Sequence, residues 1–135
     1  MTAWSLHTGG CLCGSVRFEA IPSAKNPHTC SCKMFQRHTG SLSTAWVEFP
    51  KSSVSWTGEG GQPSTYRSSA NSSRAFCANC GSTIGAIDDQ PTVALLVGCF
   101  DNTDRKDLVA SAHSFQNHKP SWWEITTCPL NEKTK

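Results

Sequence analysis

Short stretches of alternating apolar and polar residues recur along this chain, and glycine, proline and serine separate them. In residues 15–20 the apolar side chains of Val16, Phe18 and Ala20 fall on one face, which is typical of a half-buried strand. Many short strands with polar turns between them predict a mainly β protein. The further strands that we expect cover residues 28–32, 42–49, 54–56, 64–68, 83–87 and 110–115.

Three other segments depart from this alternation. Residues 92–97 are almost continuously apolar, which predicts a central strand. Residues 33–39 predict a short helix that ends at Gly40. Residues 21–27 contain two prolines and therefore predict a loop.

Eight cysteines among 135 residues add candidate chemistry to this pattern. A disulfide within a Cys-x-Cys pair would close a small, strained ring, whereas two such thiolates can both point at one metal ion. We therefore favour metal binding over disulfides for the outer two pairs, which together offer the four thiolates of a closed tetrahedral zinc site. The three closely spaced pairs are Cys11 with Cys13, Cys30 with Cys32, and Cys77 with Cys80.

Composition and charge narrow the class of protein. Hydrophobic residues make up 37% of the chain, and 12 Lys and Arg against 10 Asp and Glu give a net charge of +2. This balance gives no sign of nucleic-acid binding, and no apolar run is long enough for a transmembrane helix. We expect one zinc-binding domain over residues 1–135, with a polar C-terminal tail over residues 126–135.

The cysteines and the N-terminus also bear on the cellular compartment. The first seven residues have neither the basic nor the apolar region of a secretory signal. Thiols that bind metal rather than pair as disulfides are typical of a reducing compartment. We therefore expect the protein to be cytoplasmic.

Six motifs follow one another along the chain. They are Gly-Gly-Cys-x-Cys-Gly at residues 9–14, Cys-x-Cys at 30–32 before a helix that ends in Thr-Gly-Ser at 39–41, Phe-Cys-x-x-Cys-Gly-Ser at 76–82, Val-Gly-x-x-Asp at 97–101, His-x-Phe at 113–115 and Lys-Pro-x-Trp at 119–122. In this order and spacing, the chain resembles the glutathione-dependent formaldehyde-activating enzyme family, which also includes centromere protein V. The resemblance covers residues 9–125, nearly the whole chain.

The resemblance implies a β-tent fold, in which small antiparallel sheets with short helical turns surround a structural zinc ion. The family's second zinc uses a Cys-x-Cys-x-x-Cys motif, whose first two positions match Cys30 and Cys32. The third position is Phe35, so this motif is incomplete. The positions that match the four ligands of the structural zinc are Cys11, Cys13, Cys77 and Cys80.

A second zinc at Cys30 and Cys32 would need a third ligand from elsewhere, and we consider Cys99, His28, His38, His113 and His118. Each has a simpler interpretation, such as a small buried residue for Cys99 or a charge at the end of a helix for His38. Phe35 could fill the vacated metal position with its ring. Trp122 and Trp123 are expected to close the core.

The resemblance implies a carbon–sulfur lyase-type enzyme that acts on thiol adducts, such as those of glutathione, of small carbonyl compounds. In this hypothesis Cys30 and Cys32 are catalytic, and Phe35, His38 and Cys99 bind the substrate. One alternative is a diverged member that catalyses dehydration, cyclisation or addition on a larger, apolar substrate, because a metal ligand is lost. Another is a zinc-stabilised binding module without catalysis. The expected partner is a small molecule, with no nucleic acid and no membrane.

Overall fold

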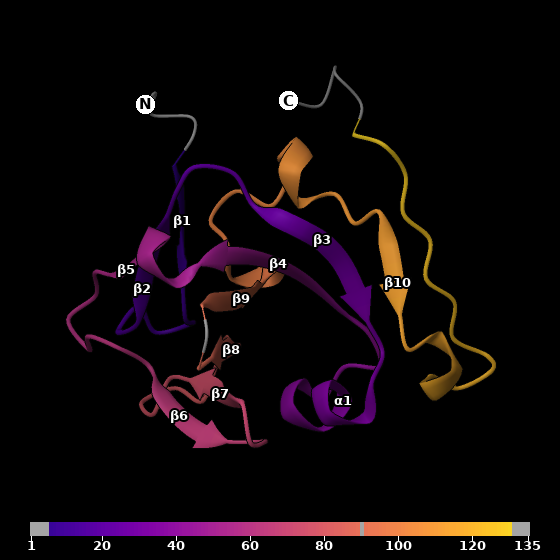
Figure 1. Cartoon of the computed structure of the whole chain (residues 1–135), viewed down its shortest axis with the longest axis horizontal. Helices are drawn as coiled ribbons and strands as arrows, with labels where there is room; N and C mark the ends of the chain where they lie inside the picture. The colour runs from indigo at the N-terminus through magenta and orange to yellow at the C-terminus, as the bar shows by residue number, and fades with distance from the viewer. Residues whose placement is uncertain (1–5, 90, 131–135) are drawn as a thin grey trace.

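Strands form most of the regular structure, as the alternation of apolar residues predicts. The computed structural model describes residues 6–89 and 91–130, and Figure 1 shows their strands curving above one short α-helix. Residues 1–5 and 131–135 lie outside the described residues, and so do the predictions about a signal sequence and about the end of the tail. Residues 124–130 contain neither helix nor strand.

A small antiparallel sheet contains three strands in the order β1-β2-β5. Phe18 and Ala20 of β2 are fully buried while Glu19 is exposed, which confirms the predicted alternation. The sequence pattern did not predict β1, because its two glycines give it no apolar alternation. The strands are β1 (His7–Gly10), β2 (Arg17–Ala20) and β5 (Val54–Trp56).

A larger sheet has the strand order β10-β3-β4-β9-β8-β7-β6, and all its neighbours are antiparallel except β10 and β3, which run parallel. The apolar β9 lies at its centre, as predicted. The loop predicted over residues 21–27 is shorter than expected, because a register shift between Lys25 and His28 lets β3 begin before Pro27. The strands are β3 (Lys25–Cys30), β4 (Thr44–Pro50), β6 (Ser64–Arg67), β7 (Ser72–Phe76), β8 (Thr83–Asp88), β9 (Thr92–Leu96) and β10 (Ala112–Ser114).

The α-helix α1 (Lys33–Thr39) has the predicted bounds. Cys32 caps its start, because its Sγ accepts a hydrogen bond from the backbone N–H of Phe35 at 3.5 Å, and the N–H of Gly40 closes its end on the carbonyl of Gln36 at 2.7 Å. No helix in the described ranges is long and apolar enough to cross a membrane. The 3-10 helices are η2 (Lys51–Ser53), η3 (Val97–Cys99), η4 (Lys106–Leu108) and η5 (Gln116–His118).

The strand β4 divides two groups of buried side chains. Val47 and Phe49 belong to the main core, which also includes Phe18 of the smaller sheet. Trp46 is only 1% exposed, yet it belongs to a second, smaller group with Cys30 and Ala86, against which Phe35 of α1 packs. Both faces of the large sheet are therefore covered at β4, the main core on one side and α1 on the other.

Candidate functional site

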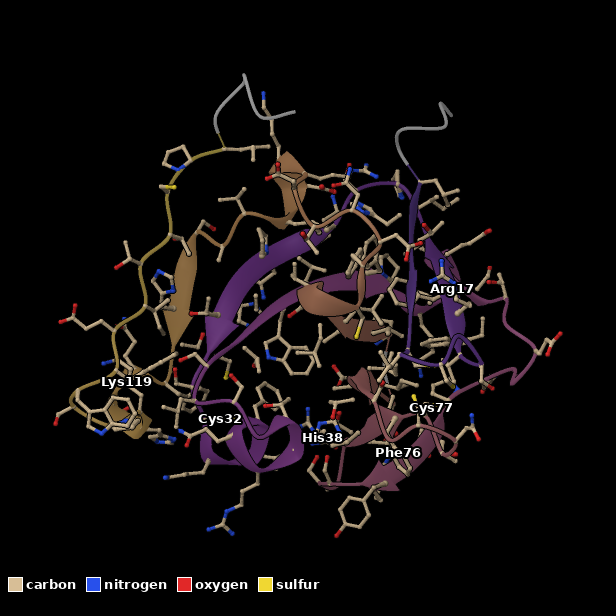
Figure 2. All side chains as sticks on the ribbon, turned by 180° about the vertical axis from the view of Figure 1, so that it is seen from behind. Arg17, Cys32, His38, Phe76, Cys77 and Lys119 are labelled. Atoms are coloured by element: carbon tan, nitrogen blue, oxygen red, sulfur yellow. The ribbon has the colours of Figure 1, made fainter. Side chains whose placement is uncertain are left out.

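Two tight turns bring together the four-cysteine cluster, which comprises Cys11, Cys13, Cys77 and Cys80. The first pair follows β1 and the second follows β7, so the cluster joins the small sheet to the large one (Figure 2 labels Cys77). The four Sγ atoms all lie within 4.8 Å of one another. Each turn ends in a glycine with a positive φ, Gly14 at 84° and Gly81 at 81°, a conformation that other residues adopt only with strain.

The spacing of the sulfur atoms fits a metal ion. The Sγ atom of Cys13 lies 3.7 Å from that of Cys11 and 3.8 Å from that of Cys77. A tetrahedral zinc with bonds of about 2.3 Å to sulfur places its ligands about 3.8 Å apart, whereas a disulfide would need about 2.05 Å. All eight cysteines are free thiols. The cluster is therefore a site that can hold one metal ion.

Hydrogen bonds lower the pKa of Cys80 and, against the opposing effect of burial, that of Cys11. The hydroxyl and the backbone N–H of Ser82 lower the pKa of Cys80 to about 5. The side-chain amide of Asn79 donates to Cys13 Sγ at 3.2 Å, and the N–H of Val16 donates to Cys11 Sγ at 3.3 Å. Because metal ions bind the thiolate, these donors prepare the cluster for a ligand role.

The middle pair, Cys30 and Cys32, occupies a different environment. Cys30 ends β3 and is only 3% exposed, and Cys32 precedes α1, where Figure 2 shows it at the opposite end from His38. Burial, together with the neighbouring Cys32 thiol, raises the pKa of Cys30 to about 11. Cys30 is therefore a protonated thiol at neutral pH.

Phe35 fills space beside the middle pair. Its ring centroid lies 4.4 Å from that of Trp46, and the guanidinium carbon of Arg74 lies 4.5 Å from the centre of the same ring. Both Phe35 and Cys32 pack against the group that holds Cys30. An apolar ring therefore stands where the family motif has its third cysteine.

None of the proposed third ligands completes a metal site at the middle pair. Among the Cys, His, Asp and Glu side chains of the described residues, only the four-cysteine cluster gathers three or more at metal distance. His28 Nδ1 lies 2.7 Å from the carbonyl oxygen of Asn26, and His113 Nδ1 lies 2.6 Å from Thr29 Oγ1. The middle pair therefore does not fit a second zinc, and no step below is assigned to one.

The remaining predicted residues lie in separate places. Cys99 packs against the main core, its thiol donates to the carbonyl of Thr83 at 3.3 Å, and burial raises its pKa to about 11. His118 is exposed. A cavity of about 280 Å³ elsewhere is lined by Glu19 and Ser55 among others and by none of the cysteines. The structure places Phe35 and His38 on α1, which Cys32 caps, while Cys30 ends β3 in the buried group against which Phe35 packs.

The prediction that Trp122 and Trp123 close the core is wrong. Trp122 is 73% and Trp123 is 36% exposed, and their rings pack against each other. The indole N–H of Trp123 donates to Ser43 Oγ at 2.9 Å, and that hydroxyl lies 2.9 Å from Ser31 Oγ. The two tryptophans therefore lie on the surface, and one is tied to the turn that contains the middle pair.

Arg74 is the functional candidate that the sequence interpretation missed. Its Nε donates to Ser68 Oγ at 3.0 Å, but its Nη1 is buried and has no hydrogen-bond partner among the described residues. Both ring nitrogens of His38 are also buried and have no hydrogen-bond partner among the described residues. Such groups cost about 1–3 kcal/mol each when they stay unpaired. An arginine within a short strand gave no signal, because surface strands often carry one.

The electrostatics of His38 follow from these surroundings. Burial, and secondarily the positive charge of Arg74, lowers the pKa of His38 below its ordinary value of 6.5. The imidazole is therefore neutral at pH 7, with one nitrogen that donates a hydrogen bond and one that accepts. A proton acceptor thus lies on the helix that Cys32 caps, and the Arg74 cation acts on both thiols through space.

These features define a small, mainly β protein with a cysteine cluster that can hold a metal ion and with a second pair of thiols near a buried arginine. The family model of the glutathione-dependent formaldehyde-activating enzyme matches residues 6–118, and the chain belongs to this family. Membership indicates a glutathione-related, formaldehyde-activating or related activity.

One solved structure shares the fold. A crystal structure of a Rhodobacter sphaeroides protein aligns with a TM-score of 0.61 over 78% of this chain and 98% of that one, at 16% sequence identity. At this identity the likeness concerns the fold alone. No curated protein sequence matches the chain significantly.

Loss of one cluster thiol should unfold the protein. The apparent binding energy of a structural zinc in small peptides is about 10–16 kcal/mol at pH 7, which is comparable to the whole stability of a domain, about 5–15 kcal/mol. We therefore expect Cys11→Ser and Cys80→Ser to lose both bound metal and the cooperative thermal transition. Elemental analysis and circular dichroism would measure these.

The matched control is Cys128→Ser, which removes an exposed thiol outside the cluster. It should keep the metal and the melting temperature of the wild type. If Cys11→Ser folds with wild-type stability, the four-cysteine cluster does not hold a structural metal.

Proposed function

We propose that this protein is a carbon–sulfur lyase-type enzyme that cleaves and forms thiol adducts of small carbonyl compounds at its middle pair. The observation that supports the proposal is that this family member has two thiols, Cys30 at the end of β3 and Cys32 at the start of α1, and that the same helix carries His38, whose buried ring nitrogens have no partner among the described residues. We further propose that the four-cysteine cluster holds zinc, because a tetrahedral set of four thiolates is typical of that metal. A reducing compartment such as the cytoplasm suits the free thiols.

The proposed step is the reversible cleavage of an adduct in which one carbon carries both a sulfur and a hydroxyl. The C–S bond breaks and its electron pair leaves with the sulfur, which takes up a proton. The hydroxyl loses its proton, and the electron pair of that O–H bond becomes the second bond of the carbonyl. The step therefore needs one proton donor and one proton acceptor, and neither an oxidant nor a reductant.

Residues around the middle pair can supply both roles. The buried S–H of Cys30 would donate a proton to the departing sulfur, and Cys32 beside it would hold that sulfur in place. The neutral imidazole of His38 has a free nitrogen that would accept the proton of the hydroxyl. Phe35 would line the site and exclude water. Cys99 stays a prediction as a further substrate contact.

A second candidate is favoured by the packing of Phe35. Its ring, with Trp46, gives the middle pair an apolar wall, which would suit a larger apolar substrate and a different reaction such as dehydration, cyclisation or addition. In that case the enzyme would be indifferent to glutathione, whereas the lyase hypothesis requires that a thiol adduct is turned over.

Exchange measurements separate the two hypotheses. Wild-type protein should accelerate the interconversion of ¹³C-formaldehyde and its glutathione adduct, followed by exchange NMR spectroscopy. Because a positioned acid or base contributes about 10²–10⁴-fold to a rate, we expect Cys30→Ser to lower the catalysed rate at least about 100-fold and Cys32→Ser to lower it as well.

Cys128→Ser, which changes an exposed thiol far along the chain, should leave the rate unchanged. No acceleration by the wild type with any thiol adduct would refute the lyase proposal and favour the diverged alternative.

Restoring the family motif should create a second metal site. Position 35 lies about one helical turn after Cys32, so Phe35→Cys would place a third thiol on the same side of α1 as Cys32. Because three protein ligands suffice for a zinc with an open position, we expect about one additional zinc per chain by elemental analysis.

Phe35→Ala is the matched control, since it removes the same ring without adding a thiol. It should bind no more zinc than the wild type. An unchanged zinc content in Phe35→Cys would show that the middle pair cannot act as a ligand pair, even with the motif complete.

A further inference from the structure

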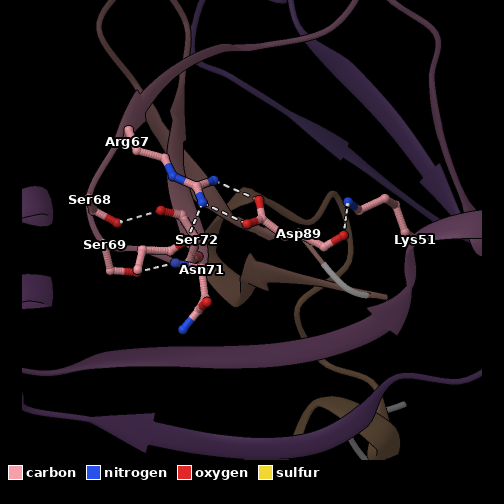
Figure 3. Close-up of polar contacts among 8 residues, drawn as sticks. Lys51, Arg67, Ser68, Ser69, Asn71, Ser72 and Asp89 are labelled. Atoms are coloured by element: carbon pink, nitrogen blue, oxygen red, sulfur yellow. Dashed lines mark hydrogen bonds and ion pairs between the residues drawn. The ribbon is translucent and has the colours of Figure 1, made fainter.

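Two arginines on neighbouring strands differ in how their charge is balanced. Arg67 of β6 lies on the surface, where its guanidinium donates two hydrogen bonds to the carboxylate of Asp89, each at 2.6 Å (Figure 3). Arg74 of β7, which pairs in register with Tyr66 of β6, takes part in none of the ion pairs of the described residues. The more buried cation is therefore the one without a carboxylate.

Arg74 is nevertheless held firmly in one place. Its guanidinium lies over the ring of Phe35, its Nε donates to Ser68 Oγ, and one terminal nitrogen lies 3.0 Å from Met34 Sδ. A thioether sulfur is only a weak acceptor, and Nη1 has no partner among the described residues. Three acidic side chains act on Arg74 through space, Cys32 most strongly and then Asp88 and Cys30, and Asp88 forms no ion pair with it. Arg74 is thus fixed in place while one of its buried donors, Nη1, stays unused.

His38 adds a second unused donor. Its ring lies close enough to Arg74 to feel that positive charge, and neither ring nitrogen has a protein partner in the described ranges. The backbone of His38 is tied to β8, because Thr83 Oγ1 donates to its carbonyl at 3.1 Å. Met34 on the same helix is 41% exposed, so a ligand could approach past a flexible side chain.

The chemistry that matches this arrangement is a planar anion. A guanidinium with a free N–H beside a neutral imidazole N–H can donate to the two oxygens of a carboxylate, and charge-assisted bonds of this kind are the strong ones. A neutral carbonyl would leave the positive charge of Arg74 unbalanced. His38 lies in the last turn of α1 and Arg74 lies over Phe35 of the same helix, whose start carries part of the proposed reaction centre.

We propose that Arg74 and His38 form a carboxylate-binding subsite, so that the substrate is a thiol–carbonyl adduct in which at least one half carries a carboxylate. The proposal rests on the lyase-type function proposed above. The carboxylate could belong to the thiol half, as in a peptide thiol such as glutathione, or to the carbonyl half, as in a 2-oxo acid. In either case Arg74 orients the adduct while its reacting carbon lies at the middle pair.

Binding of two unreactive thioethers tests the subsite and separates the two sources. S-(2-hydroxyethyl)glutathione carries carboxylates only in its thiol half. The thioether (2-hydroxyethylsulfanyl)acetate carries one only in the half that replaces the carbonyl compound. Isothermal titration calorimetry with the metal-loaded protein should detect binding of at least one of them. Because the lost contact is charge-assisted, Arg74→Gln should weaken that binding about tenfold or more.

Arg67→Gln is the matched control, because it removes the same charge from the neighbouring strand and should leave the affinity unchanged. His38→Phe is a second variant, which keeps a ring but removes both nitrogens, and it should weaken the same ligand. Bis(2-hydroxyethyl) thioether, which has no carboxylate, should bind equally to the wild type, Arg67→Gln and Arg74→Gln. Metal content and melting temperature would establish that each variant is folded.

The outcomes distinguish this proposal from the proposed function. Loss of binding in Arg74→Gln without any catalysed adduct exchange by the wild type would support the subsite and refute the lyase activity. Catalysed exchange with equal affinity in the wild type, Arg74→Gln and His38→Phe would refute the subsite and leave the lyase activity standing. Equal weakening in Arg67→Gln and Arg74→Gln would also overturn the subsite, since it would show only an effect of net charge.

Discussion

Four sulfur atoms within 4.8 Å of one another are the constraint on which this structure depends. Thiolates at such distances repel each other unless a cation lies between them, and hydrogen bonds from Ser82 favour the thiolate form of Cys80. The cluster is also the point where the turn after β1 meets the turn after β7. A metal ion held there would therefore also tie the two sheets together, which would add stability to a chain of modest apolar content.

The two kinds of cysteine site have opposite electrostatics. The cluster is rich in N–H and O–H donors, whereas Cys30 lies in an apolar group with Trp46, where burial keeps it protonated. The apolar ring of Phe35 extends that group and also supports the guanidinium of Arg74. Phe35 therefore has a role of its own, because its ring supports a cation that acts on both thiols. In this account the metal stabilises the fold and the groups around α1 carry the chemistry.

Sequence patterns predicted those parts of the structure that depend on neighbours in the chain. The bounds of α1, the central position of β9 and the four ligands of the cluster follow from local signals such as a cap, an apolar run or a spacing. The strand β1 carries no apolar alternation, and Trp122 is exposed although its ring is large. Arg74 could not be predicted as a functional residue, because what marks it is a buried donor without a hydrogen-bond partner among the described residues. Only the packing of β7 against α1 reveals that donor.

The central claim is that the metal belongs to the four-cysteine cluster alone, leaving the middle pair free for chemistry. X-ray absorption spectroscopy at the zinc edge, on protein purified without chelators, tests it most directly. The account predicts a single zinc environment with sulfur neighbours only, at about 2.3 Å. A zinc shell that mixes sulfur with nitrogen or oxygen would contradict it, because it would show a second metal bound at Cys30 and Cys32.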